Sequence, residues 1–500
     1  MLFVNEDWIH FLVTRYNAGI ALTEKVIRDY VYQFKDTQVT DFTMNVNGTL
    51  STAPSKCWDT FADKYEKTEE NGKPVDYRNT FVAAAYGLQQ QGLDLFAIWI
   101  EAAKEIGVRP WISVRMNDCH GSHEQTDVRQ GDYIAAHPEQ HIGAYREKTG
   151  YFDYSLNFAY PQVRKHLLDY IDEMLDRYDV YGLELDMMRD FIFFSFGRVE
   201  EGYPIMKQLM EEIFAIVAKQ EKRRGHEIKI ALIAPSSPNM LLERGVNLMD
   251  FVDGIDYITI ISRWQTTNTD MPIELWKQLL RGTDVKLGGG QQLLYKPYSD
   301  YKEVIVSEEM TYAQAIANLS RGCDYVYLYN YMDMSGFCGS VEGIEKYFYP
   351  GSIRTEGALP RIFRTAGKMD TLLQQTRSHV VTFDDFFNYA GNYARLPIIY
   401  GCSDAFERIK IPVGKLPQKA KLALVLGIQE EDPIMPEDAK VYVNAKKANF
   451  LEKTKINPHI YEGDCFSFAV EPENLTVMYA EVRIDKKCRL EYAEIRVIPE

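Results

Sequence analysis

The segment 181–190 reads YGLELDMMRD, and in it two acidic residues, Glu184 and Asp186, alternate with apolar ones. Alternation of this kind predicts a β-strand, in which side chains two positions apart share one face. Glu184 and Asp186 should therefore point the same way, with Cα atoms about 6.5 Å apart. Two carboxylates on a buried face are costly unless a reaction uses them or a cation neutralises them. This strand is thus the first candidate for proton transfer or nucleophilic attack.

Two neighbouring predicted strands also carry polar faces, with Asn45 on one and Arg115 and Asn117 on the other. We expect these faces to point into a barrel whose outside is covered by helices. Arg115 should form an ion pair with Glu184 and lower the pKa of that carboxyl. Asp186 would then lie nearer the open end of the barrel, within reach of substrate, as the nucleophile or base.

These strands belong to a regular alternation of strand-like and helix-like segments that runs to about residue 378. The predicted strands are 2–6, 39–47, 111–117, 180–186, 228–234, 255–262, 285–287 and 325–331. The predicted helices are 22–34, 93–106, 161–178, 203–223, 239–251, 273–280, 312–321 and 361–375. Eight strand–helix units favour a closed (β/α)8 TIM barrel over an open doubly wound sheet. No glycine-rich dinucleotide motif follows the first strand, which weakens the open-sheet alternative.

Beyond about residue 380, short alternating runs separated by Pro, Gly, Asn and Asp replace the helical period. They predict an antiparallel β-sandwich. The expected organisation is a catalytic (β/α)8 barrel over 1–378 and a C-terminal β-sandwich domain over 379–500, which makes the fold class α/β. Long insertions at 48–90, 118–160 and 332–360 fall where a strand leads to a helix, the face that carries barrel active sites.

Composition narrows the choice of partners. The net charge of −16 disfavours nucleic acid and anionic membrane surfaces, which need a basic footprint. The sequence has no apolar run long enough to span a bilayer, and its first residues do not resemble a signal peptide. The seven cysteines are scattered singly, which suits a reducing compartment and argues against zinc ribbons. We therefore expect a cytoplasmic protein with a carbohydrate partner and no cofactor, although a trimmed secreted form would look the same.

The segment 181–189 (YGLELDMMR) resembles bacterial glycosyl-hydrolase-like (β/α)8 barrel proteins, as do 156–164 (LNFAYPQVR) and 491–495 (EYAEI). The strand is also distantly similar to the nucleophile strand of α-amylase-type and α-galactosidase-type glycoside hydrolases. The resemblance implies hydrolysis of glycosidic bonds. The chain departs from the α-amylase pattern in two ways. Glu184 stands where that pattern has an arginine, and 235–238 (PSSP) lacks the general acid expected after the fifth strand.

Glycoside hydrolysis requires two carboxyl groups. With Asp186 as one, the candidates for the second are Glu184, Asp190, Asp118 and Asp333. Residues near the predicted strand ends are candidates for substrate binding: Asn45, Arg115, Asn117, His120, Arg189, Arg263, Trp264, Gln291, Asn330 and Tyr331.

Two other features could hold a different ligand. Asp118, His120 and His123 share a glycine-containing loop, a weak zinc pattern, and we expect His120 to bind a hydroxyl group and no metal to be present. The glycines 288–290 could cradle a phosphate or allow a close approach to the strand.

The leading hypothesis is a glycoside hydrolase acting on an oligosaccharide or glycoconjugate. A non-catalytic glycan-binding barrel that has lost its general acid is the first alternative, supported by the absent acid after the fifth strand. A metal- or phosphate-dependent barrel lyase or aldolase is the second. The sequence leaves open the sugar, the stereochemical course and the oligomeric state.

Overall fold

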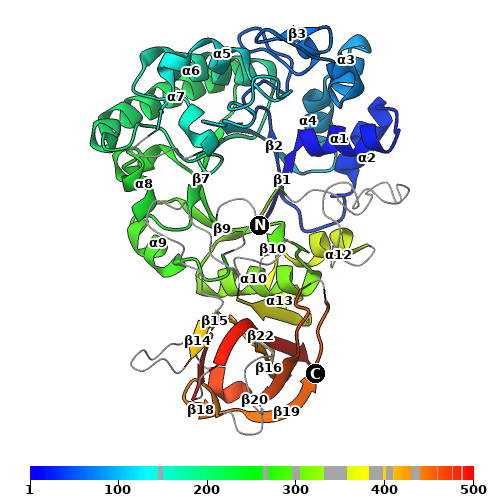
Figure 1. Cartoon of the computed structure of the whole chain (residues 1–500), viewed down its shortest axis with the longest axis vertical. Coiled ribbons are helices and arrows are strands. Elements are labelled where there is room, and N and C mark those ends of the chain that lie inside the picture. The colour runs from blue at the N-terminus through cyan, green and yellow to red at the C-terminus, as the bar shows by residue number, and fades with distance from the viewer. Residues whose placement is uncertain are drawn as a thin grey trace.

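Eight parallel strands close a barrel in the computed structural model, and the C-terminal region adds two antiparallel sheets (Figure 1). The structure describes residues 1–144, 150–262, 268–295, 304–330, 357–381, 398–400, 409–428, 440–458, 460–475, 477–485 and 488–500. This architecture confirms the predicted fold class, a TIM barrel followed by a C-terminal antiparallel β region.

All eight predicted barrel strands are present. They are β1 (Leu2–Asp7), β2 (Asp41–Asn45), β5 (Arg109–Arg115), β6 (Gly182–Asp186), β7 (Lys229–Pro235), β8 (Tyr257–Ile261), β9 (Lys286–Gln292) and β12 (Tyr325–Tyr329). Around the barrel they follow the order β1-β12-β9-β8-β7-β6-β5-β2. In this order β6 and β12 stand on opposite walls, so side chains on their inner faces point toward each other. Two short hairpins, β3 (Glu69–Glu70) with β4 (Lys73–Pro74) and β10 (Leu294–Tyr295) with β11 (Val304–Ile305), lie outside the barrel sheet.

Helices surround the barrel in Figure 1. They are α1 (Trp8–Asn17), α2 (Glu24–Tyr32), α3 (Val82–Gln90), α4 (Leu95–Glu105), α5 (Asp132–Ala136), α6 (Pro161–Arg177), α7 (Gly202–Arg224), α8 (Asn239–Glu243), α9 (Ile273–Leu279), α10 (Glu308–Arg321), α12 (Ala358–Thr365) and α13 (Met369–Leu372). Local interactions determine where several of these helices begin or end. The Asp94 carboxylate caps α4 by accepting from the N–H groups of Phe96 and Ala97, and Gly225, with φ of 78°, ends α7 in the left-handed region.

Three predicted elements differ from the structure. The predicted helix 239–251 is broken into α8 and a single 3-10 turn at Leu248–Asp250, because Gly245 adopts a φ of 78° and turns the chain between them. The predicted helix 361–375 is two short helices, α12 and α13, with Gly367 between them. The seventh strand does not end at 287, since β9 continues through the three glycines to Gln292.

The glycines of β9 are explained by packing. A Cβ atom on Gly288 would lie 2.1 Å from the Tyr325 ring, and one on Gly289 would lie 2.5 Å from Asn318 Nδ2. The run therefore lets neighbouring side chains approach the strand closely. It lies within β9 and does not form a phosphate-binding loop.

The C-terminal region forms two antiparallel sheets that share one apolar cluster, to which Ile411, Leu424 and Val482 belong. The first sheet contains β13 (Arg377–Val380), β14 (Ile398–Tyr400), β22 (Cys488–Pro499), β16 (Ala420–Ile428), β20 (Cys465–Val470) and β19 (Asn449–Thr454). The second contains β15 (Ile409–Pro412), β21 (Tyr479–Ile484), β17 (Val441–Val443) and β18 (Lys446–Lys447). Strand β13 packs against α10 of the barrel and spans the boundary predicted at 378/379, which stays a prediction. Among the described helices, none is both long and apolar enough to cross a membrane.

Candidate active site at the mouth of the barrel

Glu184 and Asp186 project into the barrel and are tied to its opposite wall. Both are buried, with 1% and 0% of their surfaces exposed. From β12, the Tyr327 hydroxyl donates to Glu184 Oε1 at 2.7 Å and the Tyr329 hydroxyl donates to Asp186 Oδ2 at 2.8 Å. The polar face of β6 therefore looks inward, and it meets a tyrosine face that the sequence analysis did not single out.

Arg115 does not pair with Glu184, so that prediction is wrong. In the parallel register Ser113 lies beside Glu184, whereas Arg115 lies beside Asp186. The Arg115 guanidinium instead forms ion pairs with Asp7 at 2.6 Å and with Asp118 at 3.2 Å. The β5–β6 register thus places the cation one inward-facing position closer to the mouth than we expected.

The protonation of Glu184 also differs from expectation. Burial raises its pKa to about 8, and the hydrogen bonds from Tyr327 and Ser113 only partly oppose that rise. We predicted that a cation would lower this pKa, and the structure contradicts that. Glu184 is therefore mainly protonated at neutral pH.

Asp186 stands at the C-terminal end of β6 and is held on both oxygens. The backbone N–H groups of Met188 and Arg189 donate to Oδ1 at 2.8 and 3.1 Å, and Tyr329 donates to Oδ2. Burial raises the pKa of Asp186, while the charge of Arg115 and these hydrogen bonds oppose the rise. Its position at the strand end matches the prediction, but with 0% exposure its carboxyl is not open to substrate in this structure, contrary to our expectation.

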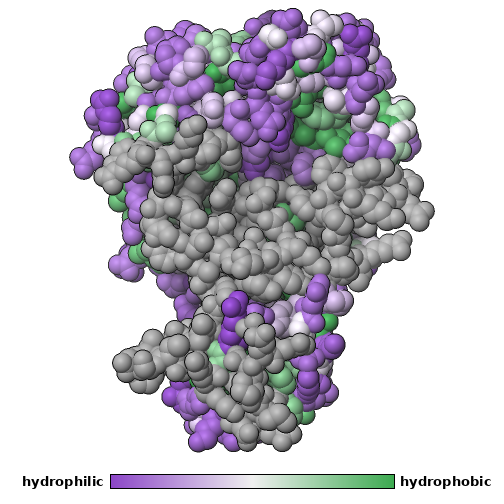
Figure 2. Space-filling view, viewed as in Figure 1, coloured by the Kyte–Doolittle hydropathy of each residue, from purple (hydrophilic) through white to green (hydrophobic). Residues whose placement is uncertain are grey.

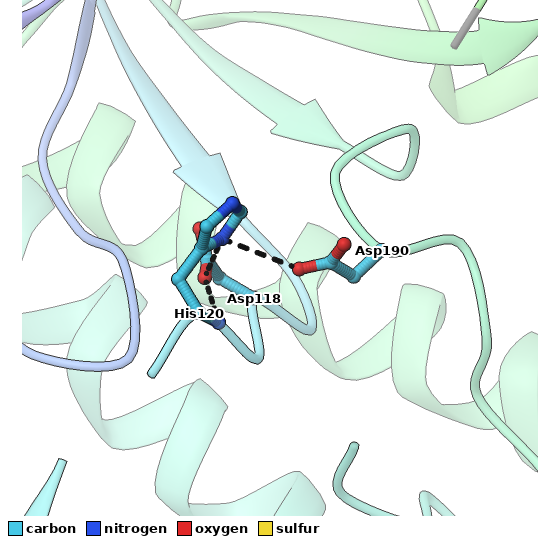
Figure 3. A group of neighbouring side chains, drawn as sticks. All are labelled: Asp118, His120 and Asp190. Carbon is cyan, nitrogen blue, oxygen red and sulfur yellow. Dashed lines mark hydrogen bonds and ion pairs between the residues drawn. The ribbon is translucent and has the colours of Figure 1, made fainter. Parts of the chain in front are cut away.

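Beyond the strand ends, Asp118, His120 and Asp190 form a cluster (Figure 3). His120 Nδ1 lies 2.7 Å from Asp118 Oδ1 and 3.5 Å from Asp190 Oδ2. Although burial raises the pKa of Asp118, His120, Arg115 and Arg189 outweigh that effect and hold it well below its usual range. Asp190 adopts a φ of 56°, and the Cys119 N–H donates to its Oδ2 at 3.0 Å.

The ligand atoms of this cluster lie within 4.8 Å of one another, so it has the composition of a metal site. Its hydrogen bonding does not fit one as it stands. The Arg189 guanidinium contacts His120 Nε2, and because a guanidinium only donates, Nε2 must accept. The ring proton is then on Nδ1, the nitrogen that faces both carboxylates. A metal bound through Nδ1 would displace this proton, and a proton moved to Nε2 would face the Arg189 guanidinium, which is also a donor. His123 lies outside the cluster, with its Nε2 atom 3.3 Å from Glu124 Oε1.

The other predicted site residues are placed as follows. Asn45 is buried on β2, where its amide meets that of Asn5 at 2.9 Å. Asn117 holds a loop, with Nδ2 donating to the Leu156 carbonyl at 2.8 Å. Asn330 follows β12, and its N–H donates to Asn5 Oδ1 at 3.1 Å. These three residues lie around the hydrogen bonds and ion pairs at the barrel mouth and are largely buried.

Gln291 is not at the mouth. It lines a cavity with residues of α10 and β13, including Gln314 and His379, on the outer side of β9. The prediction placed it at the mouth because the strand was expected to end at 287. Four other predicted residues lie outside the residues that the structure describes: Arg263, Trp264, Tyr331 and Asp333.

Sequence reasoning missed Asp7, Tyr327 and Tyr329. Their signals were present: β1 ends in the polar run Asn5, Glu6 and Asp7, and β12 has a tyrosine at every second position. Alternating tyrosines on a barrel strand place a row of hydroxyl groups on one face.

No protein-family model matches the sequence, and no curated protein matches it. Among solved structures, a glycoside hydrolase family 18 N-acetylglucosaminidase from Paenibacillus barengoltzii is 11% identical over 60% of this chain and 71% of that one, with a TM-score of 0.32. The PgaB (BpsB) glycoside hydrolase domain from Bordetella bronchiseptica is 10% identical over 71% of this chain and 99% of its own, with a TM-score of 0.39. Chitinase ChiW from Paenibacillus sp. str. FPU-7 is 10% identical, with a TM-score of 0.40. The match to ChiW covers 100% of this chain and 54% of that one.

None of these three is described as an α-amylase or an α-galactosidase, the types that the sequence resemblance named. At these identities and TM-scores the similarity assigns no activity to this chain. The case for a function rests on the residues at the mouth of the barrel.

Proposed function

We propose that this protein hydrolyses a glycosidic bond at the C-terminal mouth of its barrel. The observation that supports this most strongly is a contrast between two carboxyl groups that both lie beside Arg115. Burial raises the pKa of Asp186, whereas His120 and the arginines lower that of Asp118. Neighbouring carboxyl groups whose pKa values are pushed apart are typical of acid–base sites, and glycosidases use such a pair.

The environments of the acids favour different roles. Asp186 is the nucleophile or base, a role that needs its ionised carboxylate, and the charge of Arg115 and three hydrogen bonds favour that form against the effect of burial. Asp118 stays ionised between Arg115 and His120, so it orients its neighbours and stabilises positive charge in the transition state. Glu184 lies one inward-facing position deeper than Asp186 and accepts from Tyr327 across the barrel. Asp190, on the loop beside His120, is then the best second carboxyl among the described residues.

Kinetics of single variants would test these roles. Wild type should turn over at least one member of an aryl-glycoside and oligosaccharide panel, and Asp186→Asn should lose that activity while keeping the fold. Azide should restore turnover in Asp186→Asn if the residue is the nucleophile. Asp190→Asn should lose activity on substrates with poor leaving groups and keep it on dinitrophenyl glycosides, which need no acid.

Asp172→Asn is the matched control, because Asp172 lies on α6 outside the barrel and pairs with Lys219. It should behave as wild type. Full activity in Asp186→Asn would refute the assignment of the site, whatever the substrate.

A non-catalytic glycan-binding barrel is the second candidate. The observation that favours it is that Asp186 is fully buried and already accepts three hydrogen bonds from the protein. Binding of glycans by calorimetry, with no turnover across the same panel, would favour this alternative over hydrolysis.

A further inference from the structure

Arg115 stands beside Asp186 in the β5–β6 register, yet among the described residues its ion pairs are with two other acids. Its Nη2 atom lies 2.6 Å from Asp7 Oδ2, and its Nη1 atom lies 3.2 Å from Asp118 Oδ2. To reach Asp7 the side chain crosses β2, because β1 and β5 both pair with that strand. Although burial lowers the pKa of Arg115, the charges of Asp7 and Asp118, in that order, outweigh this effect and raise it. Asp7 is therefore the strongest partner of this cation.

Asp7 ends β1 and caps α1, so its two oxygens have different partners. The Ile9 N–H donates to Oδ1 at 3.1 Å, while Arg115 donates to Oδ2. A helix cap does not need a charge, because Asn and Ser cap helices about as well as Asp does. The negative charge of Asp7 is therefore explained by Arg115 and not by the helix.

Attachment of α1 to the barrel does not require the ion pair either. Phe11 and Leu12 are buried, and the Phe11 ring packs edge-on against Trp99 of α4 with centroids 5.0 Å apart. Figure 2 shows apolar surface in the hollow over α1 and α4. Replacing a buried ion pair with apolar groups is often neutral or stabilising, so stability is a poor reason for the pair with Arg115. Its position next to the reacting carboxyl points to another reason.

We propose that Asp7 is a positioning residue of the proposed active site, which holds the Arg115 guanidinium beside Asp186 and keeps it from closing onto that carboxyl. This role rests on the proposed function, in which Asp186 is the reacting carboxylate. Arg115 stays near enough to favour the ionised form of Asp186. A direct ion pair would go further and make the carboxylate a weaker nucleophile and base, because the cation stabilises its charge.

The sign of the effect on Asp186 follows from the groups that face it. On one side β7 offers Ile233, which carries no charge. The charged and titratable groups around Asp186 are Arg115 on β5, Tyr327 and Tyr329 on β12, and Glu184 on β6. Neutralising Asp7 releases Arg115 toward Asp186 and removes a negative charge from the mouth. Both changes should lower the pKa of Asp186.

Carbon-13 NMR of protein labelled at the aspartate carboxyl carbons measures this titration without any substrate, and the signal missing from Asp186→Asn identifies Asp186. Asp7→Asn keeps the helix cap and removes the charge. Its Asp186 midpoint should lie about 1 pH unit below that of wild type, the lower end of the effect of a cation brought next to a carboxylate. Asp7→Ser, a second neutral cap, should shift the midpoint in the same direction. In turnover assays the acidic limb of the pH profile should move with it.

Asp94→Asn is the matched control, because Asp94 caps α4 in the same way and accepts from the Tyr178 hydroxyl where Asp7 accepts from Arg115. It should leave the Asp186 midpoint unchanged. The proposal is overturned if that midpoint stays in place or rises in both Asp7 variants. Loss of the fold in both of them, seen by thermal unfolding, would also overturn it by showing that the charge serves stability.

The same measurements separate this role from hydrolysis itself. A shifted midpoint without turnover of any glycoside would refute the proposed function and leave the effect of Asp7 on Asp186 standing. Turnover with an unmoved midpoint would refute the role of Asp7 alone.

Discussion

Replacing Glu184 with glutamine should make the protein more stable above neutral pH. The amide has the shape of the carboxylic acid, so it can accept from Tyr327 and meet Ser113 as the protonated side chain does. It cannot ionise. The variant therefore keeps the neutral form that the buried site favours, at every pH.

The size and sign of the effect follow from the pKa of Glu184, which burial raises from 4.5 to about 8. The folded state binds this proton more tightly than the unfolded chain does. The resulting stability is fully present below about pH 4.5 and is lost as the pH rises through about 8. At about 1.4 kcal/mol per pKa unit, wild type should lose up to about 5 kcal/mol relative to Glu184→Gln across this range.

Urea unfolding near pH 4.5 and near pH 9 measures this difference, followed by tryptophan fluorescence because all six tryptophans precede residue 379. The two proteins should have similar midpoints at the lower pH, and the variant should have the higher midpoint at the upper pH. Glu173→Gln is a control, because hydrogen bonds from Cys57 and Ser55 outweigh burial and lower the pKa of Glu173, so its effect on stability should differ little between these two pH values. Parallel pH profiles for wild type and Glu184→Gln would refute the claim that Glu184 is protonated in the barrel.

Three further substitutions test the packing and the electrostatics. Gly182→Ala should destabilise the barrel by at least about 1–3 kcal/mol in urea unfolding, because the new Cβ would lie 2.2 Å from the Trp111 ring. Tyr329→Phe removes a hydrogen-bond donor from Asp186 and should raise the pKa of Asp186 further. The acidic limb of the pH–activity profile should then move to higher pH. If the limb does not move, Asp186 is not the group whose titration produces it. Arg377→Met should leave stability unchanged or raise it by about 1–4 kcal/mol, because Arg377 is 0% exposed and burial without a described acidic partner lowers its pKa to about 10. A large loss of thermal stability in Arg377→Met would show that contacts of the Arg377 guanidinium outweigh the cost of burying its charge.

The barrel could be predicted because its signal is local. Each strand and most helices carry their own hydrophobic period, and eight repeats leave few alternative folds. The elements that were misjudged depend on contacts across the fold. The glycines of β9 look like a loop in sequence, and only the Tyr325 ring and Asn318 packed against them explain why the strand continues. Gln291 was misplaced for the same reason.

The inward direction of Glu184 and Asp186 followed from their spacing, but their partners did not. The partner of Arg115 depends on the β5–β6 register, and a shift of two residues moves its charge from Glu184 to the level of Asp186. Tyr327 and Tyr329 were missed because they reach across the barrel from a strand 143 positions later. Sequence spacing predicts which way a side chain points, whereas barrel closure decides what it meets.

The hydrogen bonds from tyrosines to carboxyl groups across the barrel also link folding to the uptake of protons from solution. In the unfolded chain Glu184 is exposed to water, and at neutral pH it carries a negative charge. In the folded barrel it is buried against Tyr327 and holds a proton. Refolding in weakly buffered solution near pH 7 should therefore consume protons from the medium, and Glu184→Gln should consume fewer.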